Sequence, residues 1–463
     1  MLRERWRRFA YFSLHRLAGS SLSKYYREFL ALERMPSLRL KELRAHRLER
    51  LLSHASNAVP FYRRCVREKE DPILSDFPVL TKRDIRESFN ELMSPELLCE
   101  YLSGKRTRGY SWMPVQTGGS TGMPTTVIHD REFRDFNRAA RLYTQHLCGF
   151  PIGTSHFKLW GSMREINAAK AALHQRVAGR LAAELVLNAF RMSEPELDAY
   201  VKMINESSAE HMLAYADAAQ RMSEYIRAER RPVRPLKSIM ACAGTLTETM
   251  RRSISEAFGG ARVHNMYGSR DCGAMACECS RGSLHVLDNK VILEIVDRDG
   301  APVPAGERGR ILVTLLANVG FPLVRYDIGD VGAFSRRSCD CGLPTGILDR
   351  VEGRSVEFLV TSEGAYVSPA YFVHLIGVVH NPGTIRRFQI VQHARDRIVL
   401  LLEVEPGATD HVLDPVLKNI RRDLLAMFGP RMNLQIDVVS HIQESASGKF
   451  IFALNKTGQL IGK

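Results

Sequence analysis

The chain has 463 residues, of which 45% are hydrophobic and 25% are charged, so it can form two or three domains with sizeable cores. Its 65 Lys and Arg against 51 Asp and Glu give a formal net charge of +14, which suits anionic ligands, but no nucleic-acid-binding module is recognisable. No stretch is apolar enough for a transmembrane segment or a secretory leader, and the nine cysteines then predict a cytoplasmic protein with reduced thiols.

The first part of the chain, to about residue 70, is predicted to be helical because its leucines recur near a 3.6-residue period. Pro60 and Pro72 mark its end. We expect residues 1–75 to form a helical segment that packs on a larger domain.

The stretch Met1–Tyr26 mixes arginines with aromatic and apolar residues, a pattern compatible with an amphipathic helix at a membrane surface. The alternative is a helix whose aromatic face packs on the body of the protein. We favour packing, because one-sided packing is the usual fate of amphipathic helices in soluble proteins.

A loop rich in glycine and hydroxyl residues follows, composed of Thr117, Gly118, Gly119, Ser120, Thr121 and Gly122. Such a loop can turn several backbone N–H groups towards an anion, and its hydroxyls add donors for phosphate oxygens. Both flanks read as short β-strands, so the arrangement differs from the strand–loop–helix of a Walker A site. A surface turn is the alternative interpretation of this loop taken alone.

Strands then alternate with helices to about Gly353, which predicts an α/β fold with parallel strand pairing. The expected helices are 133–147, 197–207, 216–229 and 247–258, and the expected strands are 158–161, 239–244, 291–296 and 310–316. Beyond Gly353 a hairpin at 357–367, strands at 387–392, 397–403 and 433–439, and helices at 369–379 and 415–427 predict a small α+β domain. The fold class is thus α/β, with a large domain at 76–353 and a small, mobile domain at 354–463.

Cysteines and a histidine suggest a structural Zn²⁺ site, since two clusters of sulfur and nitrogen ligands in a reduced chain fit tetrahedral coordination. Five candidates compete for four places, and free thiols beside a surface histidine are the alternative. The candidates are Cys277, Cys279, His285, Cys339 and Cys341.

Motifs in a fixed order resemble those of the adenylate-forming superfamily, and within it the phenylacetate–CoA ligase-like branch. They are the loop 117–124, Tyr267-Gly268-Ser269-Arg270-Asp271, 325–330, Gly353-Arg354 and 445–449, with further similarity at 51–55, 59–62 and 77–82. The resemblance covers nearly the whole chain after about residue 45.

This resemblance implies an enzyme that joins a carboxylic acid to the α-phosphate of ATP, with Mg²⁺, releases pyrophosphate, and transfers the acyl group to coenzyme A. Transfer to an amine or to a carrier-protein thiol is the alternative, and an inactive nucleotide-binding scaffold is the second. Relatives are often homodimers.

The resemblance also assigns the nucleotide site. Residues Thr117 to Gly122 would hold the β- and γ-phosphates, and Tyr267 with Gly268 and Ser269 would line the nucleotide pocket. Gly244 would let adenine lie on bare backbone. Asp330 would accept hydrogen bonds from the ribose hydroxyls, with Asp327 as its competitor.

Three further residues are assigned to the reaction and to the domain junction. Asp271 would bind Mg²⁺, Lys449 would contact the carboxylate and the α-phosphate, and Arg354 would stand at the junction. A lysine suits bridging two anions because it is a compact charge on a long stem.

The chain departs from the family pattern at three positions. Met123 replaces a charged residue after the phosphate loop, Asp271 is one methylene shorter than the usual glutamate, and Val356 replaces the usual hinge acid. For the zinc, relatives favour four of the five candidates. They are Cys279, His285, Cys339 and Cys341, with Cys277 in reserve.

Overall fold

The structure is a computed structural model that describes most of the chain. The described residues are 2–104, 112–116, 125–160, 173–189, 192, 194–354, 359–362, 366–367, 372, 375–376, 380, 384–405, 408–443 and 452–457. The predicted phosphate loop 117–122 with Met123, the hinge residue Val356, most of the expected helix 369–379, and Lys449 lie outside the described residues.

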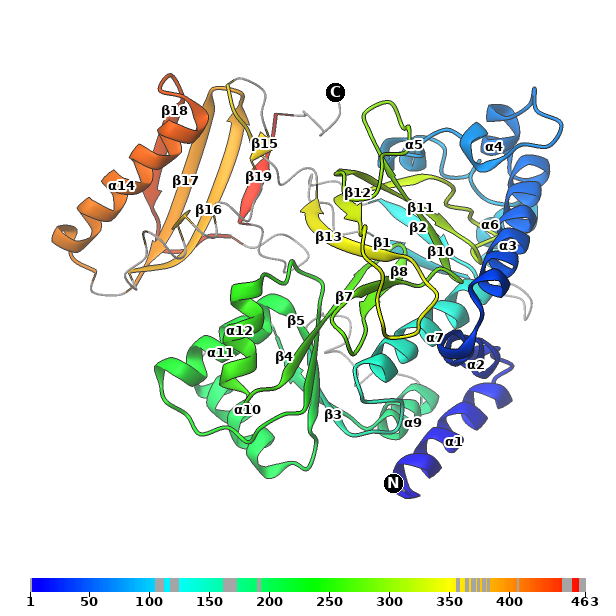
Figure 1. The fold of residues 1–463 in the computed structure, drawn as a ribbon, viewed down its shortest axis with the longest axis horizontal. Helices are drawn as coiled ribbons and strands as arrows, with labels where there is room; N and C mark the ends of the chain where they lie inside the picture. The colour runs from blue at the N-terminus through cyan, green and yellow to red at the C-terminus, as the bar shows by residue number, and fades with distance from the viewer. Residues whose placement is uncertain are drawn as a thin grey trace.

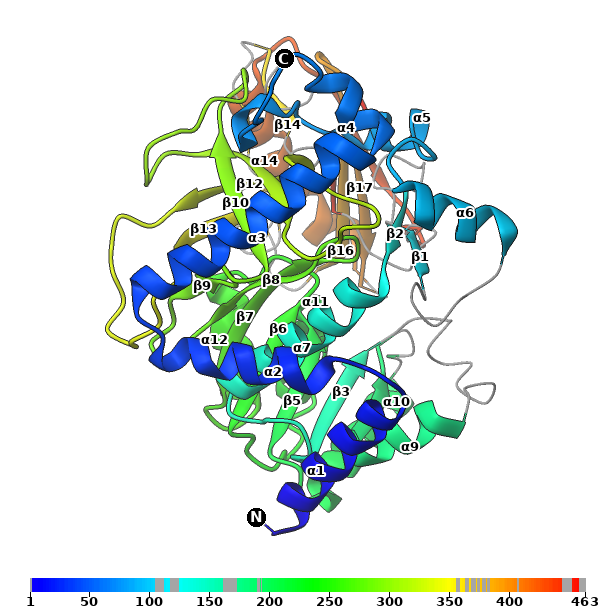
Figure 2. The same ribbon diagram turned by 90° about the vertical axis from the view of Figure 1, so that its right-hand side faces the viewer.

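Helices make up the N-terminal region, which confirms its predicted helical character. Their bounds are α1 Leu2–Leu17, α2 Leu22–Ala31, α3 Ser37–Ala58, α4 Pro60–Cys65, α5 Lys82–Glu87 and α6 Pro95–Ser103. They run along the outer side of the large body, and α1 lies at its periphery (Figures 1 and 2). None of the helices in the described part of the chain is long and apolar enough to cross a bilayer.

A short antiparallel pair flanks the predicted phosphate loop, as the two apolar runs predicted. Strands β1 (Met113–Gln116) and β2 (Thr126–His129) pair with Gln116 opposite Thr126. Gln116 and Thr126, the described residues on either side of the predicted loop, are therefore neighbours.

The central sheet is mixed, with one parallel and one antiparallel half. Its eleven strands run in the order β10-β11-β12-β13-β9-β8-β7-β6-β5-β3-β4. Their bounds are β3 His156–Trp160, β4 Glu184–Asn188, β5 His211–Tyr215, β6 Ser238–Cys242, β7 Arg262–Ser269, β8 Gly273–Glu278, β9 Leu284–Val286, β10 Val291–Val296, β11 Gly309–Leu315, β12 Tyr326–Phe334 and β13 Ile347–Arg354. Strands β4, β3, β5, β6 and β7 pair in parallel, and all other neighbours are antiparallel.

Helices follow the parallel strands, as in other α/β folds. They are α9 Leu173–Ala182, α10 Glu194–Glu206, α11 Ala216–Ala228 and α12 Glu248–Ala257, whereas α7 Arg131–Leu147 follows β2 and precedes β3. Helices α10 to α12 share one hydrophobic core with β3, β5 and β6, whereas α7 joins the N-terminal helices and the antiparallel strands in another. The mixed α/β class and its alternation are confirmed.

The C-terminal residues form a separate small α+β unit with its own core. Its elements are β14 Leu359–Val360, β15 Tyr366–Val367, β16 Ile385–Ala394, β17 Arg397–Val404, α14 Asp410–Phe428, β18 Asn433–Val438 and β19 Ala453–Asn455. Its four-stranded sheet, in the order β18-β17-β16-β19, stands apart from the central sheet, with α14 packed against it (Figure 1). The expected start of α14 at Pro415 was wrong: the helix begins at Asp410 and contains Pro415, although a proline inside a helix removes one backbone hydrogen bond.

Candidate functional site

Two motifs far apart in the sequence meet through reciprocal tyrosine–aspartate hydrogen bonds. Tyr267, in β7, donates its hydroxyl proton to Asp330 Oδ2 at 2.8 Å, across 63 residues of sequence. Tyr326, at the start of β12, donates to Asp271 Oδ2 at 2.7 Å, across 55 residues. Each candidate acid is therefore bound by the tyrosine of the other motif, and all four residues are buried.

Burial keeps both acids oriented. Asp271 is 3% exposed and Asp330 is 9% exposed. Burial, with the nearby Asp330 charge, raises the pKa of Tyr267 well above its ordinary value, so its hydroxyl remains a donor. A hydrogen bond from a neutral donor to a buried carboxylate contributes about 1.5–3 kcal/mol, enough to fix the carboxylate rotamer.

Asp330 and its competitor Asp327 have different partners. Asp327 accepts from Arg310 Nη1 at 2.9 Å and from the backbone N–H of Gly329 at 2.9 Å, which are the contacts of a paired turn residue. Asp330 instead meets Tyr267. The β11–β12 ladder is irregular between the two acids, where Gly329 has a φ of +83°, so their partners and not strand alternation distinguish them.

His129 holds the turn that contains Asp271 through a hydrogen bond to its backbone. His129 Nε2 lies 2.7 Å from the backbone carbonyl of Asp271, and because a carbonyl only accepts, Nε2 carries the proton. Burial lowers the pKa of His129 to about 4, so the ring is neutral at physiological pH.

Lys290 is a second clamp on this turn, and sequence reasoning missed it. Its Nζ donates to the carbonyls of Cys272 at 2.6 Å and Ala274 at 2.8 Å and lies 5.1 Å from the centre of the Phe133 ring. Its side chain is fully buried, and burial lowers its pKa to about 7. A lysine directly before the apolar strand 291–296 is the only sequence signal, and it does not predict burial.

Gly273 completes the turn. It has a φ of +68°, and a Cβ at this position would lie 1.8 Å from Asn137 Oδ1 in α7. Only glycine fits, so α7 packs directly on the backbone that follows Asp271.

The buried amine predicts a pH dependence of stability. Between pH about 7 and the ordinary lysine pKa of 10.5, the unfolded chain holds a proton that the folded chain releases, so folding gains up to about 1.4 kcal/mol per pH unit. Relative to Lys290→Met, the wild-type melting temperature should therefore rise from about pH 6 to about pH 9. The melting temperature of the control Lys202→Met, which replaces an exposed lysine, should depend on pH as that of the wild type does. Parallel curves of melting temperature against pH for the wild type and Lys290→Met would contradict a lowered pKa of Lys290.

The carboxyl ends of the parallel strands gather side chains at one edge of the sheet, where ligands bind in open α/β folds. Trp160 ends β3 and Tyr215 ends β5, and their ring centres lie 4.1 Å apart. Tyr215 was missed because the strand His211–Tyr215 was not predicted, although its apolar run directly before a helix is the signal for one.

Gly244 lies at this same edge, two residues beyond the end of β6. A Cβ at Gly244 would lie 3.3 Å from Asp217 Oδ2 at the start of α11, and the preceding Ala243 has a φ of +59°. The chain therefore turns sharply here and presents backbone close to its neighbours. Gly268 and Ser269 end β7 on the neighbouring strand.

Arg354 is placed by its backbone alone. The backbone of Arg354 pairs with that of Asp330 in the β12–β13 ladder. The predicted junction residue is therefore a backbone neighbour of the predicted ribose-binding acid.

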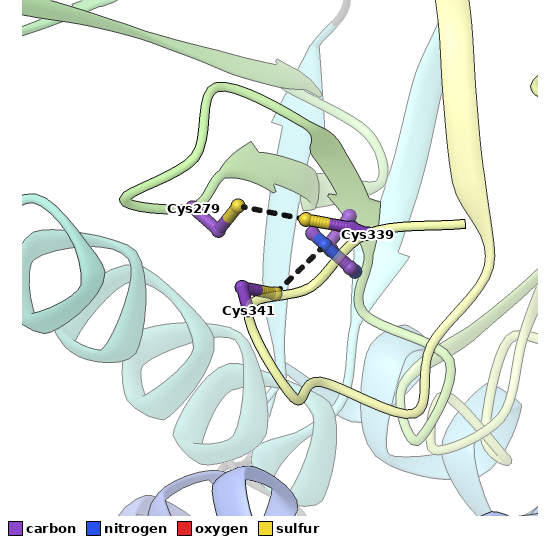
Figure 3. Close-up of side chains that lie close together, drawn as sticks. Cys279, Cys339 and Cys341 are labelled. Carbon is purple, nitrogen blue, oxygen red and sulfur yellow. Dashed lines mark hydrogen bonds between the residues drawn. The ribbon is translucent and has the colours of Figure 1, made fainter. Parts of the chain in front are cut away.

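Four side chains from two hairpins converge in a candidate metal centre. Figure 3 shows the three cysteines among them. The ligand atoms of Cys279, His285, Cys339 and Cys341 all lie within 4.8 Å of one another. Cys279 Sγ lies 3.7 Å from Cys339 Sγ, close to the ~3.8 Å between two thiolates on a tetrahedral zinc with bonds of about 2.3 Å.

His285 has the orientation of a metal ligand. Its Nδ1 lies 3.0 Å from Thr345 Oγ1, while its Nε2 faces Cys341 Sγ at 3.2 Å. Such a contact on the other ring nitrogen usually fixes a ligating histidine. Burial lowers the pKa of His285, which favours the neutral ring that metals bind.

Cys277, the reserve candidate, lies elsewhere. Its Sγ is 3.9 Å from Cys148 Sγ in a separate buried cluster. Strand β8 ends at Glu278, and the chain then turns, so Cys279 leaves the face that Cys277 occupies.

The comparisons agree with this architecture. Residues 359–456 match the family described as the CapK C-terminal domain. The chain is 25% identical over 417 residues to a phenylacetate–coenzyme A ligase of Thermus thermophilus, covering 85% of this chain and 86% of that protein.

Two solved structures share the fold. A 2-hydroxyisobutyryl-CoA ligase in the postadenylation state, in complex with R3-HIB-AMP, aligns with a TM-score of 0.66 at 17% identity over 92% of this chain and 91% of its own. The amide bond synthetase McbA from Marinactinospora thermotolerans aligns with a TM-score of 0.50 at 15% identity, over 74% of this chain and 67% of its own.

Proposed function

We propose that this chain, a phenylacetate–CoA ligase-like member of the adenylate-forming superfamily, activates a carboxylic acid with ATP and transfers the acyl group to coenzyme A. In the first step the carboxylate oxygen attacks the α-phosphorus, the bond to the β-phosphate breaks, and pyrophosphate leaves. In the second the coenzyme A thiolate attacks the acyl carbon, and AMP leaves with the electron pair.

The observation that carries this proposal is the reciprocal pairing of Tyr267 with Asp330 and of Tyr326 with Asp271. Two acids of different motifs thus stand in two buried pairs that are near enough for the charge of Asp271 to act on Tyr267. Both acids would bring negative charge towards a polyanionic nucleotide. Two buried carboxylates are costly unless each has a task or a counterion. A magnesium nucleotide supplies both, with ribose hydroxyls for one acid and a cation for the other.

Asp271 fits Mg²⁺ through its donor set. Tyr326 binds Oδ2, so the carboxylate is held in one orientation and Oδ1 is the atom offered to a cation. Magnesium is commonly held by one or two carboxylates together with phosphate oxygens, and it neutralises charge on the phosphates.

Asp330 fits the ribose because an ionised carboxylate accepts two hydrogen bonds from neighbouring hydroxyls. Gly244 lies at the sheet edge where adenine would rest. Three further roles stay predictions from the resemblance: phosphate binding by residues 117–122, contact of Lys449 with the reacting anions, and the junction role of Arg354.

We also propose that Cys279, His285, Cys339 and Cys341 hold a structural zinc ion. The set of three thiolates and one imidazole leaves no open coordination position, so the ion would act by holding the two hairpins together. This would tie the strand that follows Asp271 to the strand that contains Asp330.

Coenzyme A is the acceptor that the sequence similarity favours. An amine or a carrier-protein thiol is the alternative, supported by the fold shared with the amide bond synthetase and by Val356 at the hinge position. Self-association as a homodimer and action in the cytoplasm, where ATP and reduced thiols are available, complete the proposal.

Pyrophosphate release tests the function. The protein is incubated with ATP, Mg²⁺ and a panel of aryl, fatty and amino acids, with coenzyme A, with hydroxylamine as a model amine, or with neither. Acid-dependent release that turns over only with coenzyme A is expected. Turnover only with the amine would favour amide synthesis, and ATP binding without release for any acid would favour the scaffold.

Tyr326→Phe tests the pairing that carries the proposal. Loss of the hydrogen bond to a buried carboxylate should lower the adenylation rate about tenfold to a hundredfold and raise the Mg²⁺ concentration for half-maximal rate. Tyr225→Phe is the matched control, since the Tyr225 hydroxyl donates to Asp198 at 2.7 Å on a peripheral helix pair. Equal rates in the two variants would reject a role for Tyr326.

A further inference from the structure

The first helix, α1, is attached to the body through one face only. Tyr11 and His15 are buried, Arg7 Nη1 donates to Ser155 Oγ at 3.1 Å, and Arg8 Nε donates to the carbonyl of Ile152 at 3.3 Å. The loop beneath is in close contact, because a Cβ on Gly153 would lie 2.7 Å from the carbonyl oxygen of Glu4. The helix is therefore anchored in a fixed rotation.

That rotation leaves a large apolar stripe uncovered. Leu2 is 87% exposed, Trp6 63%, Phe9 72% and Leu17 89%. These positions are separated by four, three and eight residues, so they lie on one face of the helix. The expectation that the aromatic residues pack on the body is correct for Tyr11 and wrong for Trp6 and Phe9.

The charges on the exposed face of α1 indicate an anionic partner. The other exposed residues of α1 are arginines, namely Arg3, Arg5 and Arg16, and the single acid of the helix, Glu4, is half-buried. The exposed face thus combines four large apolar side chains with three positive charges and no negative charge. The chain as a whole carries a net charge of +14.

We propose that α1 docks the protein on an anionic lipid bilayer by lying in the plane of the interface. Leu2, Trp6, Phe9 and Leu17 would enter the boundary between headgroups and acyl chains, and the flanking arginines would bind lipid phosphates. Tryptophan favours this depth because its ring is apolar and its N–H is polar. Figures 1 and 2 place α1 at the outer edge of the molecule, away from the C-terminal unit, so a flat surface can reach it.

We propose a lipid surface as the binding partner of this face. An anionic bilayer is fluid, so it can accept the apolar side chains and the arginines without a preformed groove of complementary shape. A protein partner or a second copy of the chain would have to present an acidic rim around an apolar groove. The net positive charge of the chain opposes close approach of two copies through this arginine-rich helix.

Co-sedimentation with vesicles tests the docking. The full chain is mixed with vesicles of phosphatidylcholine containing about a third phosphatidylglycerol, and with vesicles of phosphatidylcholine alone. We expect binding to the anionic vesicles that weakens as salt rises. The double variant Trp6→Gln/Phe9→Gln should lower the partition coefficient at least about tenfold, since each exposed side chain loses its burial in lipid.

Leu38→Gln is the matched control. Leu38 lies on α3 and is 69% exposed. Its substitution removes an exposed apolar side chain outside the proposed face and should leave vesicle binding unchanged. Absence of binding to anionic vesicles, or equal binding by the double variant, would overturn the proposal. Self-association of the wild type that the double variant abolishes, without vesicle binding, would assign the face to a second copy and also overturn it.

Discussion

Lys449→Ala is expected to lower the rate of acid-dependent pyrophosphate release by about a hundredfold to a thousandfold. The affinity for ATP should stay within about threefold of that of the wild type. The lysine would stabilise charge that develops between the attacking carboxylate and the α-phosphate, an interaction that strengthens in the transition state. Its removal should therefore affect the rate far more than ground-state binding. Single-turnover release and ATP titration, measured on the same preparation, separate the two effects.

Lys456→Ala is the control for Lys449. Lys456 is an exposed lysine that directly follows β19 in the same unit, so its removal alters net charge equally without touching the predicted motif. A Lys449→Ala rate within about threefold of wild type would remove this residue from the reaction. An equal loss of rate in Lys449→Ala and Lys456→Ala would indicate that the net charge of the C-terminal unit matters, and not the position of Lys449.

Cys339→Ser is expected to remove a stoichiometric zinc ion and to destabilise the large domain. Structural zinc binding contributes about 10–16 kcal/mol in zinc-finger peptides, and strand pairing here retains part of the local order, so we expect a loss of at least about 3 kcal/mol. Adenylation should fall as well, because the hairpins that the ion would join lead to Asp271 and Asp330. Zinc content by mass spectrometry and thermal unfolding provide the two readouts.

Cys277→Ala distinguishes the two groups of cysteines. Cys277 is buried against Cys148, so its truncation should cost some stability while leaving the zinc content unchanged. Full zinc retention in Cys339→Ser would reject the proposed centre, and zinc loss in Cys277→Ala would mean that the ligands differ from the four that converge in the structure.

The sequence alone determined what depends on short-range order. Periodicity predicted α7, α10, α11 and α12 to within a few residues, because an amphipathic helix has its pattern within its own segment. The motif acids Asp271 and Asp330 and the four converging metal-ligand candidates could be named because their residue types and order resemble a known family. Strands β4, β5, β7, β8, β9, β12, β13 and β19 were not predicted. Several of them are short, and the longer β7, β12 and β13 contain glycines and charged residues that interrupt the apolar pattern of a strand.

Only the tertiary structure decided which side chains meet. The pairing of Tyr267 with Asp330 and of Tyr326 with Asp271 depends on how strands that are not neighbours in the sheet approach each other. The burial of Lys290 and the exposure of Trp6 likewise depend on what packs against each segment. Residue type and local spacing do not contain this information, because burial and partner choice arise from long-range contacts that form only when the whole chain folds.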